Sequence, residues 1–200
     1  YPLIMGSLLL STLLSLWPAF NTTPPPLPSF QDIRTAHRPS DKRLLDRSGV
    51  VIHELRTDMQ RRLLAWTPLA EISPALQTAV LAAEDRRFYQ HNGVDYSALV
   101  AAAIQRLTGG PRRGASTISM QLSSMLEPHH QPSSGSRTLS QKWDQMQHAW
   151  TLERSWSKTE ILEAYLNLVS FRGELQGVAA AASVLFRKAP HGLTQAEASV

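Results

Sequence analysis

The sequence predicts a mainly helical domain that carries one small β-hairpin. Helix-starting signals recur along the chain, each a capping residue followed by apolar residues at helical spacing. The clearest strand signal is a β-branched run behind a Ser-Gly pair, within residues 43–55. The chain has 200 residues, 42% of them hydrophobic and 18% charged. That is enough to bury a core as one domain, or as one domain with a tail.

The first 20 residues predict a transmembrane anchor or signal-anchor. They carry no charge and are mostly large and apolar, and roughly 18 such residues suffice to cross a bilayer. Trp17 and Pro18 favour an interfacial helix end over the competing interpretation, a cleaved signal peptide. The basic residues downstream disfavour the usual orientation, because positive flanks prefer the cytoplasm. These are Arg34, Arg38, Lys42 and Arg43.

A proline-rich linker and a hairpin follow the anchor. Residues 21–42 contain a run of prolines between 24 and 28, which is typical of a stiff, extended linker. In residues 43–55, Ser48 and Gly49 form the expected turn and residues 50–52 form the expected strand. We expect this hairpin to pack against one edge of the domain that follows.

Three helices are expected in the first half of that domain. Ser73 and Pro74 begin the first, with a buried stripe that includes Leu76, Val80 and Ala83. Asp95 begins the second, which ends at the glycine pair 109–110. Ser116 begins the third, which ends before residue 128.

The second half is expected to be helical as well. A polar loop at 131–136 precedes a longer helix over about 137–155, and the Ser157–Glu160 capping box begins a helix over 161–167. Gly177 precedes an alanine-rich helix that ends near Lys188. The Thr194–Glu197 box opens a last helix that the chain does not complete, which indicates a fragment of a longer protein.

Glu84 is the first candidate for chemistry. It continues the apolar stripe of its helix at a spacing of four from Val80, so burial should raise the pKa of its carboxyl toward the range of a general acid or base. The alternative is a carboxylate that is ion-paired with Arg86, Arg87 or His91.

A second group of candidates could hold an anion. Ser116 and Thr117, with Ser119 and Gln121, stand at a predicted helix start, where backbone N–H groups and hydroxyls bind phosphate. The alternative is an ordinary helix cap. Arg137 and Lys142 add two cations, which could equally be solvated surface residues. The net charge of +4 fits a partner rich in phosphate, and the absence of cysteine excludes disulfides and thiolate metal sites.

These segments resemble, in order, the five motifs of the peptidoglycan glycosyltransferases, glycosyltransferase family 51. That family forms the N-terminal domain of class A penicillin-binding proteins and also occurs as monofunctional enzymes. The matching segments are Glu84–Tyr89 with His91 and Gly93, then Gly114–Leu122, Arg137–Gln145, Ser157–Asn167 and Gln176–Val178.

The resemblance implies a lysozyme-like glycosyltransferase domain over residues 43–200, truncated at its C-terminal end, with a cleft between a large lobe and a smaller membrane-proximal lobe. It implies polymerisation of lipid II into glycan chains, with release of undecaprenyl pyrophosphate. Glu84 would be the general base and Gln121 would position substrate. The leaving pyrophosphate would be stabilised by the residues Ser116, Thr117, Arg137 and Lys142.

The resemblance also implies partners and a location. The partners are lipid II, the growing glycan strand, the membrane and other cell-wall synthesis proteins, and the location is the bacterial inner membrane with the catalytic domain facing the periplasm. A divalent cation such as Mg²⁺ would assist the pyrophosphate, although no carboxylate cluster in the sequence marks a metal site. Nucleic acid is not expected as a partner, because the sequence lacks interleaved aromatic and basic residues.

Three positions depart from the family pattern. Gln145, which belongs to the predicted substrate-binding residues, stands where the family usually has glutamate. Gln141 stands where the family usually has arginine, and Ser124 stands where it usually has lysine. Gln145 and the run at 126–129 resemble the 1C subgroup of penicillin-binding proteins. The alternative function is a catalytically weak domain that binds lipid II or scaffolds a cell-wall complex. A glycan-cleaving enzyme is disfavoured, since it needs no pyrophosphate site.

Overall fold

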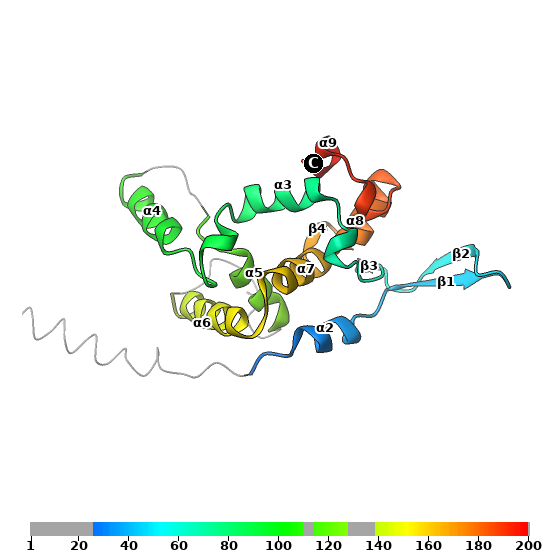
Figure 1. Cartoon of the computed structure of the whole chain (residues 1–200), viewed down its shortest axis with the longest axis horizontal. Helices are drawn as coiled ribbons and strands as arrows, with labels where there is room; N and C mark the ends of the chain where they lie inside the picture. The colour runs from blue at the N-terminus through cyan, green and yellow to red at the C-terminus, as the bar shows by residue number, and fades with distance from the viewer. Residues whose placement is uncertain (1–25, 110–113, 128–138, 200) are drawn as a thin grey trace, which may run out of the picture.

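A computed structural model describes residues 26–109, 114–127 and 139–199 and shows a mainly helical body with a small amount of β structure (Figure 1). The predicted balance of helix and strand is confirmed. The helices are α2 (Phe30–Ala36), α3 (Pro74–Glu84), α4 (Tyr96–Leu107), α5 (Ile118–Leu126), α6 (Leu139–Ser155), α7 (Lys158–Leu168), α8 (Val178–Phe186) and α9 (Gln195–Ala198). The strands are β1 (Asp41–Leu45), β2 (Val51–Arg56), β3 (Arg62–Leu63), β4 (Ser170–Arg172) and β5 (Leu175–Gln176).

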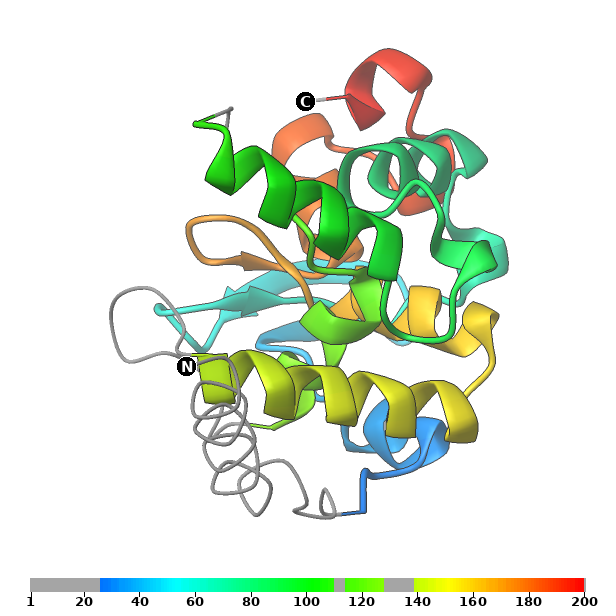
Figure 2. The same cartoon turned by 90° about the vertical axis from the view of Figure 1, so that its left-hand side faces the viewer.

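Helix α7 is the centre of the core. Every residue from 161 to 167 is buried, so the helix is surrounded by protein on all sides. Helix α5 packs against both α6 and α7. Figures 1 and 2 show α4 and α6 on the same side of the molecule, with α5 between them. The core of α7 therefore supports α5, whose start carries several of the predicted site residues.

The polar residues of α7 are buried with partners. The Glu163 carboxylate accepts hydrogen bonds from the Trp66 indole at 2.8 Å and from the backbone N–H of Leu69 at 2.7 Å. The side chain of Asn167 bonds the backbone N–H and carbonyl of Thr67, both at 2.8 Å. Since buried polar groups are costly without partners, these bonds fix residues 66–69 against α7.

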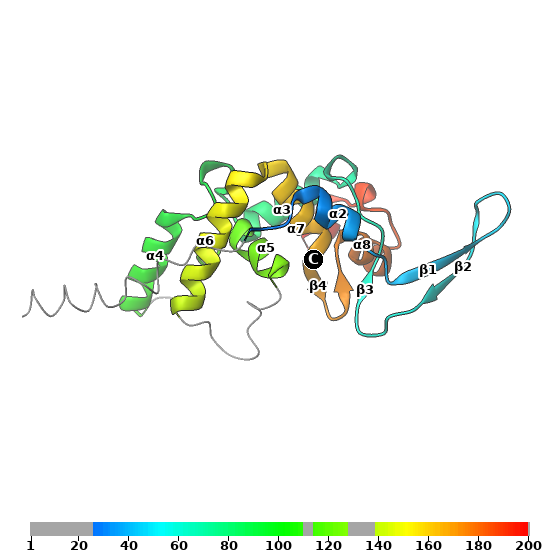
Figure 3. The same ribbon diagram turned by 90° about the horizontal axis from the view of Figure 1, so that it is seen from below.

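The hairpin forms where it was predicted, but it does not pack as predicted. Strands β1 and β2 pair antiparallel, and they project from the body (Figures 1 and 3). Leu44 is 60% exposed and Ile52 is 62% exposed. The expectation that the hairpin packs against an edge of the domain is wrong. Its strands lack the alternation of apolar and polar residues that would give the core one apolar face.

Helix α2 lies within the interval that was predicted as an extended linker. Ser29 and Asp32 form a capping box at its start, and Phe30 contacts the rings of Trp66 and Trp156 edge-on. The run of prolines ends at Pro28 and the next proline is Pro39, so none lies within α2 to prevent the helix. The proline-rich composition predicted a linker, and the capping box at Ser29 and Asp32 was not recognised in the sequence.

The predicted membrane anchor, residues 1–20, and the first part of the linker lie outside the described residues. Within the ranges that are described, no helix combines the length and the apolar character needed to cross a membrane.

A three-stranded sheet was not predicted at all. Its order is β3–β5–β4, with β3 parallel and β4 antiparallel to β5. Strands of two or three residues leave no periodic signal in a sequence. The sheet joins residues 62–63 to 175–176 and so connects the segment before the site to the last third of the chain.

Candidate active site

Glu84 is the last residue of α3, and its carboxylate is exposed. Of the predicted stripe, Leu76 is buried and Val80 is half-buried, whereas Ala83 and Glu84 are exposed. The expectation that Glu84 is buried is therefore wrong, because α3 leaves the core after its first turns.

The alternative interpretation of Glu84, an ion pair with a neighbouring base, is not realised either. Arg86 donates to the carbonyl of Ala82 at 3.1 Å, Arg87 binds Asp95 and His91 binds Asp85. Instead, the Glu84 carboxylate accepts a hydrogen bond from the side-chain amide of Gln121 at 2.8 Å.

Tyr165 fixes the orientation of that amide. Its hydroxyl donates to Gln121 Oε1 at 3.1 Å, so Gln121 Nε2 points to Glu84. Burial, and next the charge of Glu84, raise the pKa of Tyr165 well above its usual value. The phenol thus stays a donor, and the order Tyr165–Gln121–Glu84 has a defined direction.

Glu84 and Gln121 line a pocket of about 490 Å³. The pocket lies between the end of α3, the start of α4 and the segment 114–117. It brings together four of the predicted site residues, Glu84, Ser116, Thr117 and Gln121. Lys142 reaches the same place from α6, where its ammonium group donates to Ser116 Oγ at 3.0 Å. Arg137 lies outside the described residues.

The start of α5 differs from the expectation by one residue. Thr117, not Ser116, caps the helix, accepting from the backbone N–H of Met120 at 3.2 Å and donating to the carbonyl of Gly93 at 2.5 Å. The N–H of Ile118 donates to the buried Asp85 carboxylate at 3.0 Å. Protein groups thus occupy the N–H donors of Ile118 and Met120, and the Ser116 hydroxyl lies at the pocket with the Lys142 ammonium bonded to it.

Two buried charge networks position these elements, and sequence reasoning missed both. In the first, Asp85 accepts from Ile118 N–H and contacts His91 Nε2 at 3.0 Å. In the second, the Lys158 ammonium donates to Glu153 and to the carbonyl of His91, both at 2.7 Å. Charged side chains that are buried are usually paired, and this rule is the only sequence-based indication of such networks. The rule does not say which residues form each pair.

Two of the positions that depart from the family pattern, Gln145 and Ser124, meet in the structure. Gln145 is 3% exposed, and its Nε2 donates to the carbonyl of Met120 and to Ser124 Oγ, both at 2.8 Å. A glutamate carboxylate at the same position would oppose the Met120 carbonyl oxygen and could not donate to it when ionised. The amide therefore suits this position, and it ties α6 to α5 without a buried charge.

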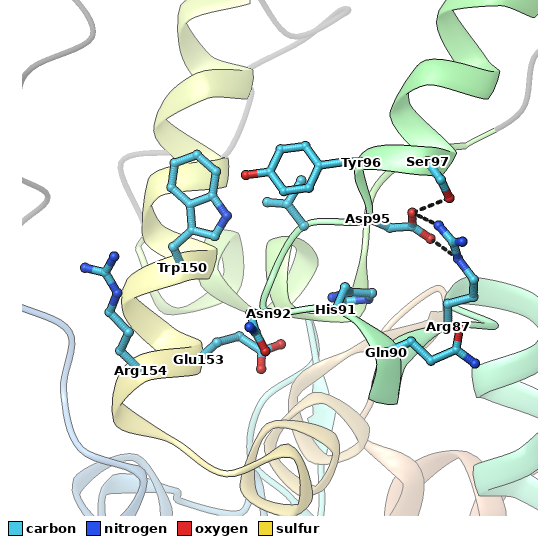
Figure 4. A pocket seen from close by; sticks show the side chains of 11 residues that line it. Arg87, Gln90, His91, Asn92, Asp95, Tyr96, Ser97, Trp150, Glu153 and Arg154 are labelled. Atoms are coloured by element: carbon cyan, nitrogen blue, oxygen red, sulfur yellow. Dashed lines mark hydrogen bonds and ion pairs between the residues drawn. The ribbon is translucent and has the colours of Figure 1, made fainter.

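Arg87 and Asp95 form one wall of the pocket. Arg87 makes a two-point ion pair with Asp95, which also accepts from Ser97 Oγ at 3.0 Å and caps α4 through Ala98 N–H at 2.8 Å (Figure 4). The hydrogen bond from Arg87, followed by those from Ala98 and Ser97, holds the pKa of the Asp95 carboxyl well below its usual range.

The carboxylates around the pocket do not form a cage for Mg²⁺. Asp85 is bound by Ile118 and His91, and Asp95 by Arg87. Within the described ranges, no group of three or more acidic or histidine side chains is placed to hold a metal ion. The donor set therefore does not fit a metal held by protein ligands alone.

The sequence is similar to known proteins over most of its length. The family model described as Transglycosylase matches residues 48–200. The chain is 35% identical to Penicillin-binding protein 4 of Bacillus subtilis (strain 168) over 155 residues, which are 77% of this chain and 24% of that protein. It is 39% identical to Biosynthetic peptidoglycan transglycosylase of Pasteurella multocida (strain Pm70) over 135 residues, 68% of this chain and 53% of that protein. The chain thus spans about half or less of the length of these relatives.

Proposed function

The chain belongs to the transglycosylase family, and from that premise we propose that it polymerises lipid II into glycan chains, with Glu84 as the general base. The observation that carries the proposal is the pocket itself. An oriented carboxylate, Glu84, lines it together with Ser116, which is bonded to the Lys142 ammonium. Proton transfer and anion stabilisation are the two tasks that such a reaction sets.

The proposed reaction assigns one role to each side of the pocket. Glu84 takes the proton from a sugar hydroxyl of the acceptor as that oxygen bonds to the anomeric carbon of the donor. The bond from that carbon to the pyrophosphate oxygen breaks, and undecaprenyl pyrophosphate leaves with the electron pair. Lys142 and Ser116 stabilise the negative charge of the leaving group. Gln121 holds Glu84 in place, and Arg137 is proposed as a second cation.

We also propose that the domain works at a membrane surface, on the periplasmic face of the bacterial inner membrane. Support comes from α4, where large apolar side chains recur at helical spacing and are all more than half exposed. Such a face suits the interface of a bilayer. Its members are Val100, Ile104 and Leu107, of which Leu107 is 87% exposed.

The catalytically weak alternative finds less support. It rested on the neutral residues Gln145 and Ser124, but these bond to each other and to the backbone of α5. These two positions therefore hold no unpaired charge, whereas the family usually has a glutamate and a lysine there. The assignment to the 1C subgroup remains a prediction, and so does association with other cell-wall synthesis proteins.

The test is synthesis of glycan chains from labelled lipid II by the wild-type chain and by Glu84→Gln. Loss of a general base should lower the rate at least about a hundredfold. Glu71→Gln, which changes an exposed carboxylate away from the pocket, is the matched control and should keep the wild-type rate. Lipid II binding without any polymer from the wild-type chain would favour the binding-domain alternative.

A divalent cation that assists the leaving pyrophosphate is proposed only from the family resemblance. Loss of polymerisation on titration of the same assay with EDTA, restored by added Mg²⁺, would support it.

A further inference from the structure

A second pocket lies beside the candidate active pocket. It has a volume of about 950 Å³ and opens between residues 87–97 and the second half of α6 (Figure 4). Arg87, Asp95 and Ser97 line both pockets, so the ion pair between Arg87 and Asp95 stands between the two cavities. The two pockets are therefore adjacent and share this ion pair as a wall.

One side of the second pocket is aromatic. The rings of Tyr96 and Trp150 are stacked, with centroids 6.5 Å apart and planes 28° apart. Trp143 packs edge-on against Trp150 at 5.7 Å and holds it from behind. Figure 4 shows the two lining rings on the same side of the pocket, with Asn92 and Glu153 below them. The rings offer an apolar surface that is fixed in orientation.

The other lining groups are polar but nearly balanced in charge. Asp95 is paired with Arg87, and Glu153 accepts from Ser119 and from the Lys158 ammonium. Arg154 is the other cation of the lining, and Gln90 and Asn92 contribute side-chain amides. This set does not concentrate positive charge as a phosphate site does. It favours a neutral ligand with hydroxyl and amide groups.

We propose that this pocket binds an N-acetylated saccharide unit of the glycan strand, at a distance from the reacting sugar. A pyranose ring has an apolar face of C–H groups and a polar edge of hydroxyls. The first suits the Tyr96 and Trp150 rings, and the second suits Asn92 and Gln90. The identification of the glycan strand as the source of this saccharide rests on the proposed function. The binding of a saccharide to the pocket does not.

A remote saccharide site would assist polymerisation in a specific way. Binding energy from a non-reacting part of the substrate can hold the strand between successive additions. Variants of the second pocket are therefore expected to form the same glycosidic bond through Glu84 but to release shorter chains.

The direct test is calorimetric titration of the chain with a β-1,4-linked tetrasaccharide of N-acetylglucosamine, which has neither peptide nor pyrophosphate. Wild type should bind saturably. Asn92→Ala and Tyr96→Ala should each weaken binding about tenfold, because each removes a polar or stacking contact from an exposed position. Arg86→Ala, which changes an exposed side chain that lines the first pocket and not the second, should bind as wild type does. Thermal unfolding of each variant checks that it is folded.

Either of two results would overturn the proposal: no saturable binding at millimolar saccharide, or binding that Arg86→Ala weakens and Asn92→Ala leaves unchanged. The second result would place the saccharide in the first pocket. If wild type binds the saccharide through Asn92 and Tyr96 but makes no glycan from lipid II, the proposed function fails and this site stands. If glycan forms but the saccharide does not bind, the proposed function stands and the saccharide site fails.

Discussion

The orientation of Glu84 depends on a residue that does not touch the proposed substrate. Tyr165 donates to Gln121, and Gln121 donates to Glu84. Without the tyrosine hydroxyl, the Gln121 amide could rotate and present its oxygen to the carboxylate, which would repel it. Tyr165 is thus a positioning residue, and Glu84 and Gln121 are the groups that line the pocket.

We expect Tyr165→Phe to lower kcat of lipid II polymerisation about tenfold while KM changes little, because the defect concerns the placement of the base rather than the binding of substrate. The free energy of unfolding should fall by only about 1 kcal/mol, the worth of one hydrogen bond. Steady-state kinetics and urea unfolding measure the two effects. Equal kcat values for Tyr165→Phe and wild type would contradict the positioning role.

Residue by residue, the sequence pointed to the pocket but not to its supports. The structure brings together five of the predicted site residues, Glu84, Ser116, Thr117, Gln121 and Lys142. Their local signals are strong, since each stands at a predicted helix end or beside one. Gln145 instead is buried between α5 and α6, and Arg137 lies outside the described residues. Asp85, Lys158 and Tyr165 were not predicted, because their roles depend on contacts between helices that are distant in the sequence. Glu84 was predicted to be buried because a helical stripe was assumed to continue to the end of its helix.

At the scale of elements, helix starts were predicted well. The capping boxes at Ser157 and Thr194 and the Asp95 cap are all present, since a cap is a short-range hydrogen bond that the local sequence specifies. Elements that depend on distant partners were missed. The strands β3, β4 and β5 exist only through one another, and α2 is held against Trp66 and Trp156.

The start of α4 should respond to acid. The folded chain holds the pKa of Asp95 well below the unfolded value of about 3.9, so near that pH the unfolded state binds more protons than the folded state does. The stabilisation is present above pH 4 and is lost as the pH falls below it. Asp95→Asn keeps a cap but loses the ion pair with Arg87, so it should cost about 1 kcal/mol at pH 7.

Urea unfolding at a series of pH values between 7 and 3 measures this effect. The wild-type chain should lose stability relative to Asp95→Asn as the pH falls through 4, so the gap between the two should close. Glu71→Gln, an exposed acid without a side-chain partner among the described residues, should run parallel to wild type. A gap that stays constant down to pH 3 would contradict the assignment of this pH response to Asp95.

At the scale of the whole molecule, the segment before α3 and the last third of the chain depend on each other. Residues 62–63 pair with β5, Thr67 bonds Asn167, and Trp66 and Leu69 bond Glu163. The backbone passes tightly at this junction, because a Cβ on Gly177, at φ +78°, would stand 2.5 Å from the carbonyl oxygen of Asn167. These contacts thus hold the segment before α3 against α7 and β5.

The carboxylate of Glu163 tests that connection. Glu163→Ala leaves the Trp66 indole and the Leu69 N–H without their acceptor beside a buried helix, so we expect a loss of about 2–4 kcal/mol in the free energy of unfolding. Glu163→Gln keeps one acceptor oxygen and should lose about half as much. Glu174→Gln, which changes an exposed acid, is the matched control. Because Glu163 does not line the pocket, the activity per folded molecule should stay unchanged at a temperature where the variants remain folded. A normal stability for Glu163→Ala would show that residues 66–69 are held by their apolar contacts alone.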